Sequence, residues 1–522
     1  MRYTFFFFFM FLFFLLNGQT TFNKRILHGY ETTIYTGLEV TDSCYYITGI
    51  FNDTIPPYIG GNIFTKISLS GEVESSTFYL DTLKDFLSWH TSMIGTMDGG
   101  FAVSGNTSGD GMEAFLMKYD ATGNIQFIST ERNPFLPEET FISPRDFIET
   151  QDSGFLLLNN IAIPSPTNSG INLIKFDKWG NEVWQQVYNT SKWERPIELI
   201  ADDDGGYLIG AWRTNLNEDN NNHISHSWII KTDSIGEVVW EYLSPSSPFG
   251  QLEQGARGII KTLDGGYVVA SGWGFEKFVN SSSGRLLFDG YFFKLDSTLT
   301  KVWDVVIRGN AQTENDRYTR MVAANDGSGY VACGSQQIIF DINGELVGGF
   351  QGWLTKISTE GDSLWNRYIS FVDPDKNHTF YDLEETIDGG FLLCGEVKNL
   401  SAPVGEPVLA AWLVKVDEYG CIVPGCHLNT SVEEQAEIDI QLSLYPNPVS
   451  DYLNIYTRLP EPIQEAEFRI VDALGREVVR FASSLSEVTH VVPVYDYAAG
   501  IYYLQYFEVG ILKQSKEFVV IK

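Results

Sequence analysis

The sequence predicts an all-β protein in which a seven-bladed β-propeller is followed by a small C-terminal β-sandwich. The first observation is composition: of 522 residues, 48 are Gly and 14% are aromatic, which favours strands and tight turns over helices. The second is a repeat, since an apolar strand containing Lys recurs through the middle of the chain every 50–60 residues or so, roughly the period of strand-built repeat proteins. The third is the last segment, where residues alternate between apolar and polar with a period of two.

Residues 1–19 are predicted to be a signal peptide. Arg2 supplies the positive start, residues 5–16 form an unbroken apolar run, and residues 17–19 offer a small-residue exit. Twelve apolar residues are too few to cross a bilayer of about 30 Å as a helix, so we expect cleavage, with an uncleaved anchor as the alternative. No transmembrane segment is predicted further along, and the mature chain is expected to be soluble and exported.

Seven repeat units are predicted between residues 20 and 428. An Asp-Gly-Gly-aromatic turn or a variant of it precedes the Lys in most units, and Gly follows five residues after the Lys in all but the fifth unit. Asp-Gly pairs adopt the positive φ that a tight hairpin needs, so each unit reads as four antiparallel strands. Seven such units match a closed propeller, which leaves no long sheet edge exposed. The repeated lysines are Lys66, Lys118, Lys175, Lys231, Lys294, Lys356 and Lys415.

The seventh unit is short in its fourth strand, where a turn between Cys421 and Cys426 takes its place. We predict that residues 22–30 add the missing strand and close the ring. The two cysteines lie across a Pro-Gly turn and are predicted to form a disulfide in an oxidising compartment. The other cysteines lie in or beside apolar strands and are expected to be buried thiols: Cys44, Cys333 and Cys394.

Residues that recur in every unit are best explained by blade geometry. The lysines are expected to pair locally with the Asp or Ser two residues further on, which lies on the same face of the strand. The tryptophans nine residues after the Lys are expected to be packing wedges between blades: Trp184, Trp240, Trp303 and Trp365. No cofactor is predicted. The Asp-rich turns leave calcium open, although they lack the alternating ligands of an EF-hand loop.

The long, unrepeated loops are all predicted to emerge on one rim of the ring, opposite the tight turns. Binding residues tend to lie on loops held by a rigid scaffold, so this face is the predicted binding face. Its aromatic and Arg side chains suit stacking on sugars or peptide side chains, although Trp212 and Trp273 could simply end their strands. The predicted ligand-binding residues are Trp193, Trp212, Arg213, Trp273, Arg317 and Tyr318, with Phe275, His378 and Tyr381 as further candidates on this face.

Several function classes are disfavoured. The formal net charge of −32 argues against nucleic acid or an anionic membrane surface as a partner. No catalytic motif is found, and no catalytic residue is predicted. His223 and His226 are spaced as metal ligands can be, but no third ligand is evident, so no metal site is predicted. With 67 acidic residues, no acid pair for glycoside hydrolysis can be chosen from the sequence.

Residues 442–522 form a separate unit after an acidic linker, residues 429–441. It opens with Tyr445-Pro446-Asn447-Pro448 and continues through an Asp-x-x-Gly-Arg turn at Gly475 and a Gly-Ile-Tyr-Tyr-Leu strand that starts at Gly500. In this order of motifs, the segment resembles the C-terminal sorting domain of the type IX secretion system in Bacteroidetes. The resemblance implies the type IX machinery as a partner and passage across both membranes. It also implies removal of the domain, followed by surface attachment or release.

The repeat units resemble those of repeat-rich Bacteroidetes surface proteins that carry this sorting domain. Their Asp-x-x-Gly-x-Val-Trp pattern is also similar to the tryptophan repeats of quinoprotein propellers, without a recognisable cofactor set. We therefore expect an exported binding or adhesion module that recognises glycan or protein through its loop-rich face. Two alternatives stay open: a secreted glycoside hydrolase or lyase with carboxylates at the central channel, and a purely structural surface protein.

Overall fold

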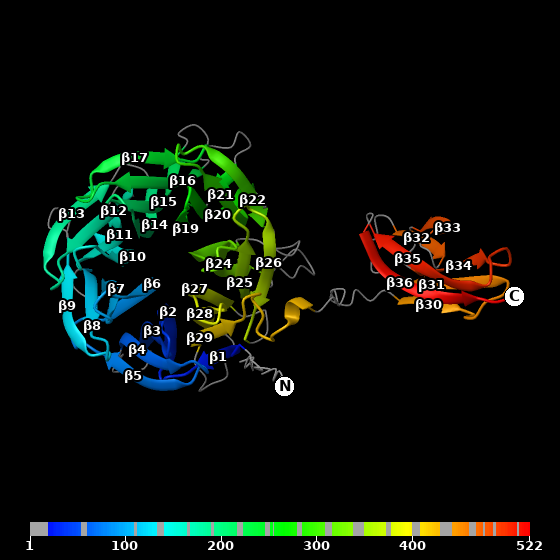
Figure 1. Ribbon diagram of the computed structural model, residues 1–522, viewed down its shortest axis with the longest axis horizontal. Helices are drawn as coiled ribbons and strands as arrows, with labels where there is room; N and C mark the ends of the chain where they lie inside the picture. Colours follow the sequence, from blue (N-terminus) through cyan, green and yellow to red (C-terminus); the bar gives the residue numbers. More distant parts are fainter. Residues whose placement is uncertain are drawn as a thin grey trace, which may run out of the picture. The chain divides into compact units, whose positions relative to one another are not determined.

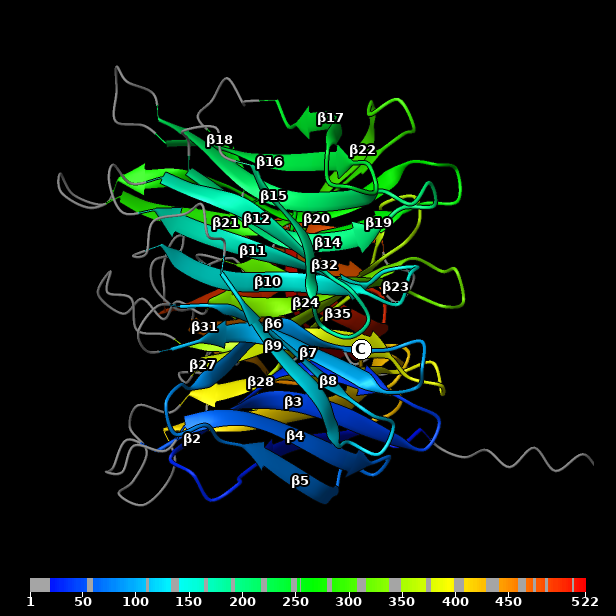
Figure 2. The ribbon, with the colours of Figure 1, turned by 90° about the vertical axis from the view of Figure 1, so that its left-hand side faces the viewer.

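The structure is a computed structural model (Figures 1 and 2). It describes residues 19–53, 60–108, 112–132, 140–163, 168–188, 193–216, 223–245, 251–253, 255–278, 284–307, 316–337, 349–371, 377–398, 408–428, 441–458, 466–472, 476–483, 487–508 and 511–522. Of the predicted signal peptide, only Gln19 falls within these ranges. No helix in the described ranges has the length and apolar character to cross a membrane. The chain divides into two compact units, Met1–Leu428 and Asn429–Lys522.

The first unit is a ring of antiparallel strand groups around a central axis, and each group is one blade (Figure 1). The first blade is β2 (Thr32–Val40), β3 (Cys44–Asn52), β4 (Gly60–Ser68) and β5 (Val73–Tyr79). The second is β6 (Phe86–Gly95), β7 (Phe101–Thr107), β8 (Ala114–Tyr119) and β9 (Ile125–Glu131). The third is β10 (Phe141–Glu149), β11 (Phe155–Ile163), β12 (Asn168–Phe176) and β13 (Glu182–Tyr188). The fourth is β14 (Trp193–Ala201), β15 (Tyr207–Leu216), β16 (His223–Thr232) and β17 (Val238–Leu243).

The second half of the ring continues this order. In the fifth blade the inner strand is split into β18 (Gln251–Glu253) and β19 (Gly258–Lys261), which pair with β20 (Tyr267–Phe278), followed by β21 (Gly284–Leu295) and β22 (Lys301–Ile307). The sixth is β23 (Arg317–Ala323), β24 (Tyr330–Gln337), β25 (Phe350–Ile357) and β26 (Ser363–Ile369). The last is β27 (Asn377–Glu385), β28 (Phe391–Lys398) and β29 (Leu409–Val416), and a short helical turn, η1 (Cys426–Leu428), follows it. The predicted all-β propeller fold is confirmed.

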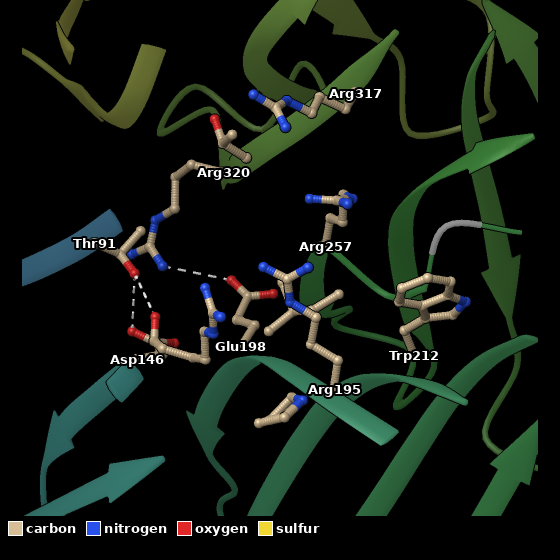
Figure 3. A pocket seen from close by; sticks show the side chains of 12 residues that line it. Thr91, Asp146, Arg195, Glu198, Trp212, Arg257, Arg317 and Arg320 are labelled. Atoms are coloured by element: carbon tan, nitrogen blue, oxygen red, sulfur yellow. Dashed lines mark hydrogen bonds and ion pairs between the residues drawn. The ribbon is translucent and has the colours of Figure 1, made fainter. Parts of the chain in front are cut away.

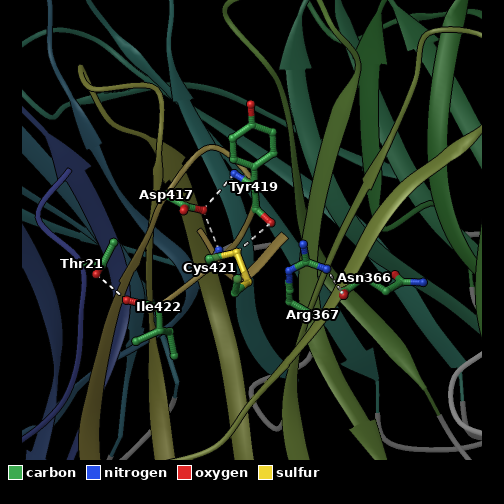
Figure 4. The surroundings of a disulfide bond; sticks show 8 residues. Thr21, Asn366, Arg367, Asp417, Tyr419, Cys421 and Ile422 are labelled. Atoms are coloured by element: carbon green, nitrogen blue, oxygen red, sulfur yellow. Dashed lines mark hydrogen bonds between the residues drawn. A yellow bond between two sulfur atoms is a disulfide. The ribbon is translucent and has the colours of Figure 1, made fainter. Parts of the chain in front are cut away.

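The N-terminal strand closes the ring. β1 (Phe22–Ile26) pairs antiparallel with β29, as the sequence predicted for the 22–30 segment. Asn23 strengthens this junction, because its side-chain oxygen accepts a hydrogen bond of 2.7 Å from Nε1 of Trp412. Nearby, the predicted pair of cysteines, Cys421 and Cys426, is joined as a disulfide (Figure 4), and the Cys421 N–H donates to the carboxylate of Asp417 over 2.7 Å.

The repeated Lys and Asp-Gly-Gly turn form one structural device. Within a blade, Lys Nζ lies 2.6–3.0 Å from the carboxylate of the turn Asp, as in Lys118 with Asp98 and Lys231 with Asp204. The lysine also donates to the carbonyl of the residue that follows it, as Lys118 does to Tyr119. The structural role of these five lysines is therefore as expected, but their carboxylate partner comes from the upstream turn, not from two residues on; Lys66 instead pairs with Glu74 on the next strand over 3.0 Å. The residue two positions on faces its own turn instead, since Asp120 accepts the Asn124 N–H.

The predicted tryptophan wedges pack across blade seams. A Cβ built on Gly361, in the Asp-x-x-Gly-like turn of the sixth blade, would lie 2.8 Å from Cε3 of Trp303 in the fifth. Gly236 lies against Trp184 in the same way. The fifth blade, which breaks the glycine pattern, has Leu299 at this position with φ 65°, and its side chain packs with Trp240. The positive φ and the neighbouring ring thus both favour glycine at this position, although the fifth blade accommodates Leu299.

The second unit is a small sandwich of two antiparallel sheets. One sheet is β30 (Gln441–Tyr445), β31 (Tyr452–Arg458) and β34 (Glu487–Pro493). The other, in spatial order, is β33 (Glu477–Ser483), β32 (Ala466–Asp472), β35 (Gly500–Glu508) and β36 (Ile511–Val520). Alternate residues of both sheets, such as Leu453 and Phe468, are buried in a shared core, as the period-two pattern predicted.

Candidate functional site

The innermost strands of the blades carry a bulge that turns side chains toward the axis. In β10 the pairing with β11 slips between Pro144 and Asp146, so Arg145 is the extra residue. β14 slips in the same way just after Pro196. Proline has no N–H to pair and is tolerated at bulges, which explains its place in these two strands. In the fifth blade the break between β18 and β19 leaves Arg257 at the corresponding place.

These bulges line a cavity of about 100 Å³ in the channel, and we call it the arginine chamber (Figure 3). Its basic side chains come from successive blades: Arg145 on β10, Arg195 on β14, Arg257 before β19, and Arg317 on β23. Most lie near the start of their strand, far from the Asp-Gly-Gly turn at its end. The chamber therefore lies toward the rim that the sequence predicted to be the binding face. Its full lining is Thr91, Arg145, Asp146, Arg195, Pro196, Ile197, Glu198, Trp212, Arg257, Arg317, Thr319 and Arg320.

Four of the chamber's arginines have no carboxylate partner among the residues that the structure describes. Among the described residues, no Asp or Glu oxygen lies within 4 Å of Arg145, Arg195, Arg257 or Arg317. The Nε atoms of Arg145 and Arg257 are buried and donate no hydrogen bond within the described ranges. The chamber thus concentrates positive charge that the described protein does not neutralise.

This charge is visible in the pKa values. Burial, and then the charges of Arg317, Arg195 and Arg145, lower the pKa of Arg257 to about 9. Burial and the charge of Arg195 lower the pKa of Arg145 to about 10. Arg195 reaches solvent, yet burial and Arg317 lower its pKa as well. Because each guanidinium disfavours the charge on its neighbours, an anion placed among them would be stabilised by all.

Arg320 lies in the same cavity but in an opposite environment. Its guanidinium lies 3.5 Å from a carboxylate oxygen of Glu198 and 3.6 Å from one of Asp382. Burial alone would lower its pKa, but Asp382, Asp146 and Glu198 raise it above the usual value. Arg320 is thus a compensated cation, and the three acids are its counter-charges.

The buried carboxylates also link neighbouring blades. Asp146 accepts the backbone N–H of Leu199 in the next blade over 2.7 Å, and Asp382 accepts that of Leu38 over 3.0 Å. Glu198 accepts the N–H of Ile259. Burial raises the pKa of Asp146 and Asp382 to about 6 and that of Glu198 to about 8. These groups are occupied by structural hydrogen bonds across blade seams.

On the other side of the acids from the arginine chamber, the channel is mostly apolar. A second cavity of about 310 Å³ shares Thr91, Asp146, Glu198 and Arg320 with the arginine chamber. Its remaining lining is mostly aliphatic or Met: Met93, Ile94, Phe147, Ile148, Leu199, Ile200, Ala201, Ile259, Ile260 and Met321. The acids and Arg320 thus lie between a cationic chamber and an apolar one.

The structure places the predicted binding residues in different settings. Trp212 and Arg317 line the arginine chamber. Arg213 points away from it, since it lies 3.1 Å from the buried carboxylate of Glu194 and stacks on Trp228. Tyr318 is fully buried and stacks on Trp353. Arg213 and Tyr318 therefore contact other side chains of the fold and are not part of the chamber lining.

The other candidates lie outside the chamber lining. Trp193 is 48% exposed. His378 is buried beside the Trp412 ring, and burial raises the pKa of Tyr381 well above its usual value. The side chains of Trp273 and Phe275 lie outside the described residues, as does that of His223, while His226 Nδ1 lies 2.7 Å from the Ser244 carbonyl oxygen.

Sequence reasoning found Arg317 but missed Arg145, Arg195 and Arg257. One signal could have found them. Arg145 and Arg257 lie at the bulge position of the first strand of a repeat unit, where other units have Thr36, Ile197, Thr319 and Tyr381; Arg195 lies two positions before the bulge of its strand, and this first strand faces the axis of a propeller. Arg is scarce in this chain, with 35 Lys and Arg against 67 Asp and Glu, so its recurrence there is informative.

One cluster has the composition of a metal site. Ligand atoms of Asp417, Cys421 and His427 lie within 4.8 Å of one another. The sulfur of Cys421 is bonded to Cys426, so it is no thiolate, and only two ligands remain. The Asp of the Asp-x-x-Gly turns, left open for calcium, bonds to its own turn, as Asp177 does with the N–H groups of Trp179 and Asn181.

Comparison with known proteins adds to this picture. The model of the secretion system C-terminal sorting domain matches residues 443–521, which include all of the predicted sorting motif; Gly475 itself lies outside the described residues. No curated protein matches the chain.

Among solved structures, the polysaccharide lyase Uly1 is 9% identical with a TM-score of 0.43, covering 73% of this chain and 89% of its own. An α-L-arabinanase from Penicillium chrysogenum in complex with arabinobiose is 11% identical with a TM-score of 0.37, covering 74% and 97%. The β-propeller domain of the Trilobed protease from Pyrococcus furiosus is 8% identical with a TM-score of 0.39, covering 76% and 98%. Likenesses this weak carry no argument about function.

The fold and the matched domain together define a class: an exported β-propeller with a sorting domain at its C-terminus. The protein is a cargo of the type IX secretion system, and its place is the cell surface or the extracellular space. The sorting domain implies that the type IX machinery is its partner during export.

Proposed function

We propose that this exported propeller is a binding module that holds a polyvalent anionic ligand in the arginine chamber. The observation that carries the proposal is the set of four guanidinium groups with no carboxylate partner among the described residues. Clustered arginines repel one another, as the lowered pKa values of Arg145 and Arg257 report. Arginine recognises planar oxyanions through paired N–H donors, so a carboxylate, sulfate or phosphate group is the matching ligand chemistry.

The net charge of the chain strengthens the argument that this arginine cluster binds an anion. A protein of formal charge −32 repels anions from most of its surface. Arg320 shows that the same channel can surround an arginine with acids. Against that background, an anion would be attracted at one place, where the four arginines converge and solvent reaches Arg195.

The secreted enzyme, a glycoside hydrolase or lyase, is the second candidate. It is favoured by Asp146 and Glu198, which line the chamber with raised pKa values, as general acids do. We favour binding because these carboxylates accept backbone N–H groups of the next blade and pair with Arg320. Turnover of an acidic oligosaccharide that disappears in Glu198→Gln, with binding retained, would favour the enzyme.

Binding is tested by calorimetric titration of the exported chain with citrate and tripolyphosphate. We expect saturable binding, and loss of about tenfold in affinity in Arg195→Gln or Arg257→Gln, because each removes a charge-assisted contact. Arg367→Gln is the matched control, since Arg367 lies on the outer strand β26 and donates to the Asn366 carbonyl. No binding of any polyvalent anion, or an equal loss in the control, would contradict the proposal.

A further inference from the structure

An indole lies beside the unpaired arginines. In the pairing of β14 with β15, Trp212 lies directly opposite Arg195, so the two side chains extend from the same face of the sheet. Their neighbours in sequence, Arg213 and Glu194, occupy the other face and pair with each other there. Trp212 also lies against Gly255, two residues before Arg257, so it lies at one side of the chamber beside Arg195 and Arg257 (Figure 3).

The Trp212 ring has no partner of its own among the described residues. No described aromatic ring or cation stacks on it, and its buried Nε1–H has no hydrogen-bond acceptor there. Trp228 and Trp412 are engaged on both counts: Trp228 donates to Glu241 and is covered by Arg213, while Trp412 donates to Asn23 and stacks on Phe380. Trp303 and Trp353 share the buried Nε1–H without a described acceptor, but Trp303 packs against Gly361 of the neighbouring blade and Trp353 stacks on Tyr318. Trp212 is set apart by its place in the lining of the arginine chamber.

We propose that the ligand of the arginine chamber is an acidic saccharide, a sugar chain whose rings carry carboxylate or sulfate groups. This inference rests on the proposed anion-binding function. The anionic group would pair with the guanidinium groups of Arg145, Arg195, Arg257 and Arg317, and the adjoining sugar ring would lie against Trp212. A flat aromatic face suits the C–H face of a pyranose, and the guanidinium forks suit its charged substituent.

The two parts of this recognition make different demands on a ligand. A small inorganic or tricarboxylic anion uses the arginines and gains nothing from the indole. A neutral oligosaccharide has the ring but not the charge, so it leaves the mutual repulsion of the arginines in place. Only a ligand that has both a sugar ring and an anionic group uses the whole chamber lining. Acidic polysaccharides occur outside cells, where this protein is exported.

The test compares ligands that differ in one feature, measured by titration calorimetry on the exported full chain. The probes are trigalacturonate, its fully methyl-esterified neutral form, a sulfated galactan oligosaccharide, citrate and ATP. We expect trigalacturonate or the sulfated oligosaccharide to bind about tenfold or more tighter than citrate, and the neutral ester not to bind measurably. Which of the two binds tighter identifies the anionic group as carboxylate or sulfate.

Substitution of the indole gives the second readout. Trp212→Ala should weaken the acidic saccharide by about tenfold and citrate by clearly less, and the retained citrate binding also shows that the variant is folded. Trp212→Phe should retain most of the saccharide affinity and serves if the alanine variant does not fold. Trp193→Ala is the matched control, because Trp193 starts β14 but lies outside the chamber lining.

Three results would overturn the inference. If citrate binds as tightly as the acidic saccharides and Trp212→Ala affects neither, the anion site stands and the saccharide is wrong. If ATP binds tightest, the aromatic face serves a nucleobase instead. If no anion binds at all, the proposed function fails together with the inference.

Discussion

Arg257 and Arg320 are both buried in one channel, and their surroundings give them opposite roles. Burial and three neighbouring arginines lower the pKa of Arg257, whereas three carboxylates raise that of Arg320. Arginine is therefore available to bind an anion at position 257 and is part of the structural framework at position 320. Composition cannot separate these roles, because they depend on which residues the bulges bring together.

The carboxylates around Arg320 predict how stability depends on pH. Burial raises the pKa of Glu198 to about 8 from its ordinary value of 4.5, and Asp146 and Asp382 are raised to about 6. Between the ordinary pKa of each carboxyl group and its raised value, the folded state holds a proton that the unfolded state has released. The free energy of unfolding therefore falls as pH rises through this range. Glu384, also raised, adds to the same trend.

We therefore expect the free energy of unfolding to be about 1–3 kcal/mol higher at pH 5 than at pH 8, as measured by urea denaturation at both values. The aspartates of the Asp-Gly-Gly turns act below this window. The pKa of Asp98 is lowered to about 2, so its stabilising effect is complete above pH 4 or so and does not vary here. Glu198→Gln should reduce the difference between pH 5 and pH 8, and an undiminished difference would exclude Glu198 as its source.

At the site, the sequence identified two of the residues that line the chamber, Trp212 and Arg317. It could do so because both were assigned to the predicted binding face, although Trp212 lies within β15 and only Arg317 stands at the end of its strand. It missed Arg145 and Arg257, since a strand pattern does not reveal where a bulge or a break in a strand turns a residue toward the axis, and it missed Arg195, which is regularly paired in β14 opposite Trp212. It also nominated Arg213 and Tyr318, whose strand positions alternate to the other side of the sheet.

Among the elements, the blades were predictable because their turns repeat. Asp-Gly-Gly and Asp-x-x-Gly turns fix strand ends through positive φ, and apolar alternation gives the faces. The partner of the repeated Lys was not predictable. The Lys lies on the third strand of the blade and the Asp in the turn between the first two strands, so their contact depends on the three-dimensional shape of the blade and not only on strand register. Within the described residues, no side-chain acid two positions on competes for that contact.

The contact between a turn glycine and the tryptophan of the preceding blade can be tested in isolation. Gly361 and Gly389 both have positive φ, 91° and 79°, but only Gly361 lies against a ring, that of Trp303. Gly389→Ala should lower the free energy of unfolding by about 1 kcal/mol, from backbone strain alone. Gly361→Ala should lower it by about 2–4 kcal/mol, because the added methyl also overpacks the blade seam.

Urea denaturation of both variants checks this. Equal losses in the two variants would show that the ring contact adds nothing and that strain accounts for the whole effect.

At the scale of the whole molecule, the matched sorting domain predicts processing. A sorting domain at 443–521 implies that this segment directs outer-membrane passage and is then removed, so we expect surface material to contain a chain that ends before Leu444. Mass spectrometry of surface and culture fractions measures this end. A variant that lacks residues 443–522 is the control and should accumulate inside the outer membrane, while an intact C-terminus at the surface would contradict removal.

The pairing of β1 with β29 has a consequence for when the molecule can form. Phe22 pairs with Lys415, so the first and last strands of the ring meet across nearly the entire propeller sequence. A contact of such long sequence separation forms late, since the intervening loop must be ordered first. The ring therefore cannot be completed while the chain is still emerging from a ribosome or a translocon. The propeller stays open until β1 and β29 are both available to pair. Such a chain is suited to crossing the inner membrane in an extended form, and the ring closes after that crossing.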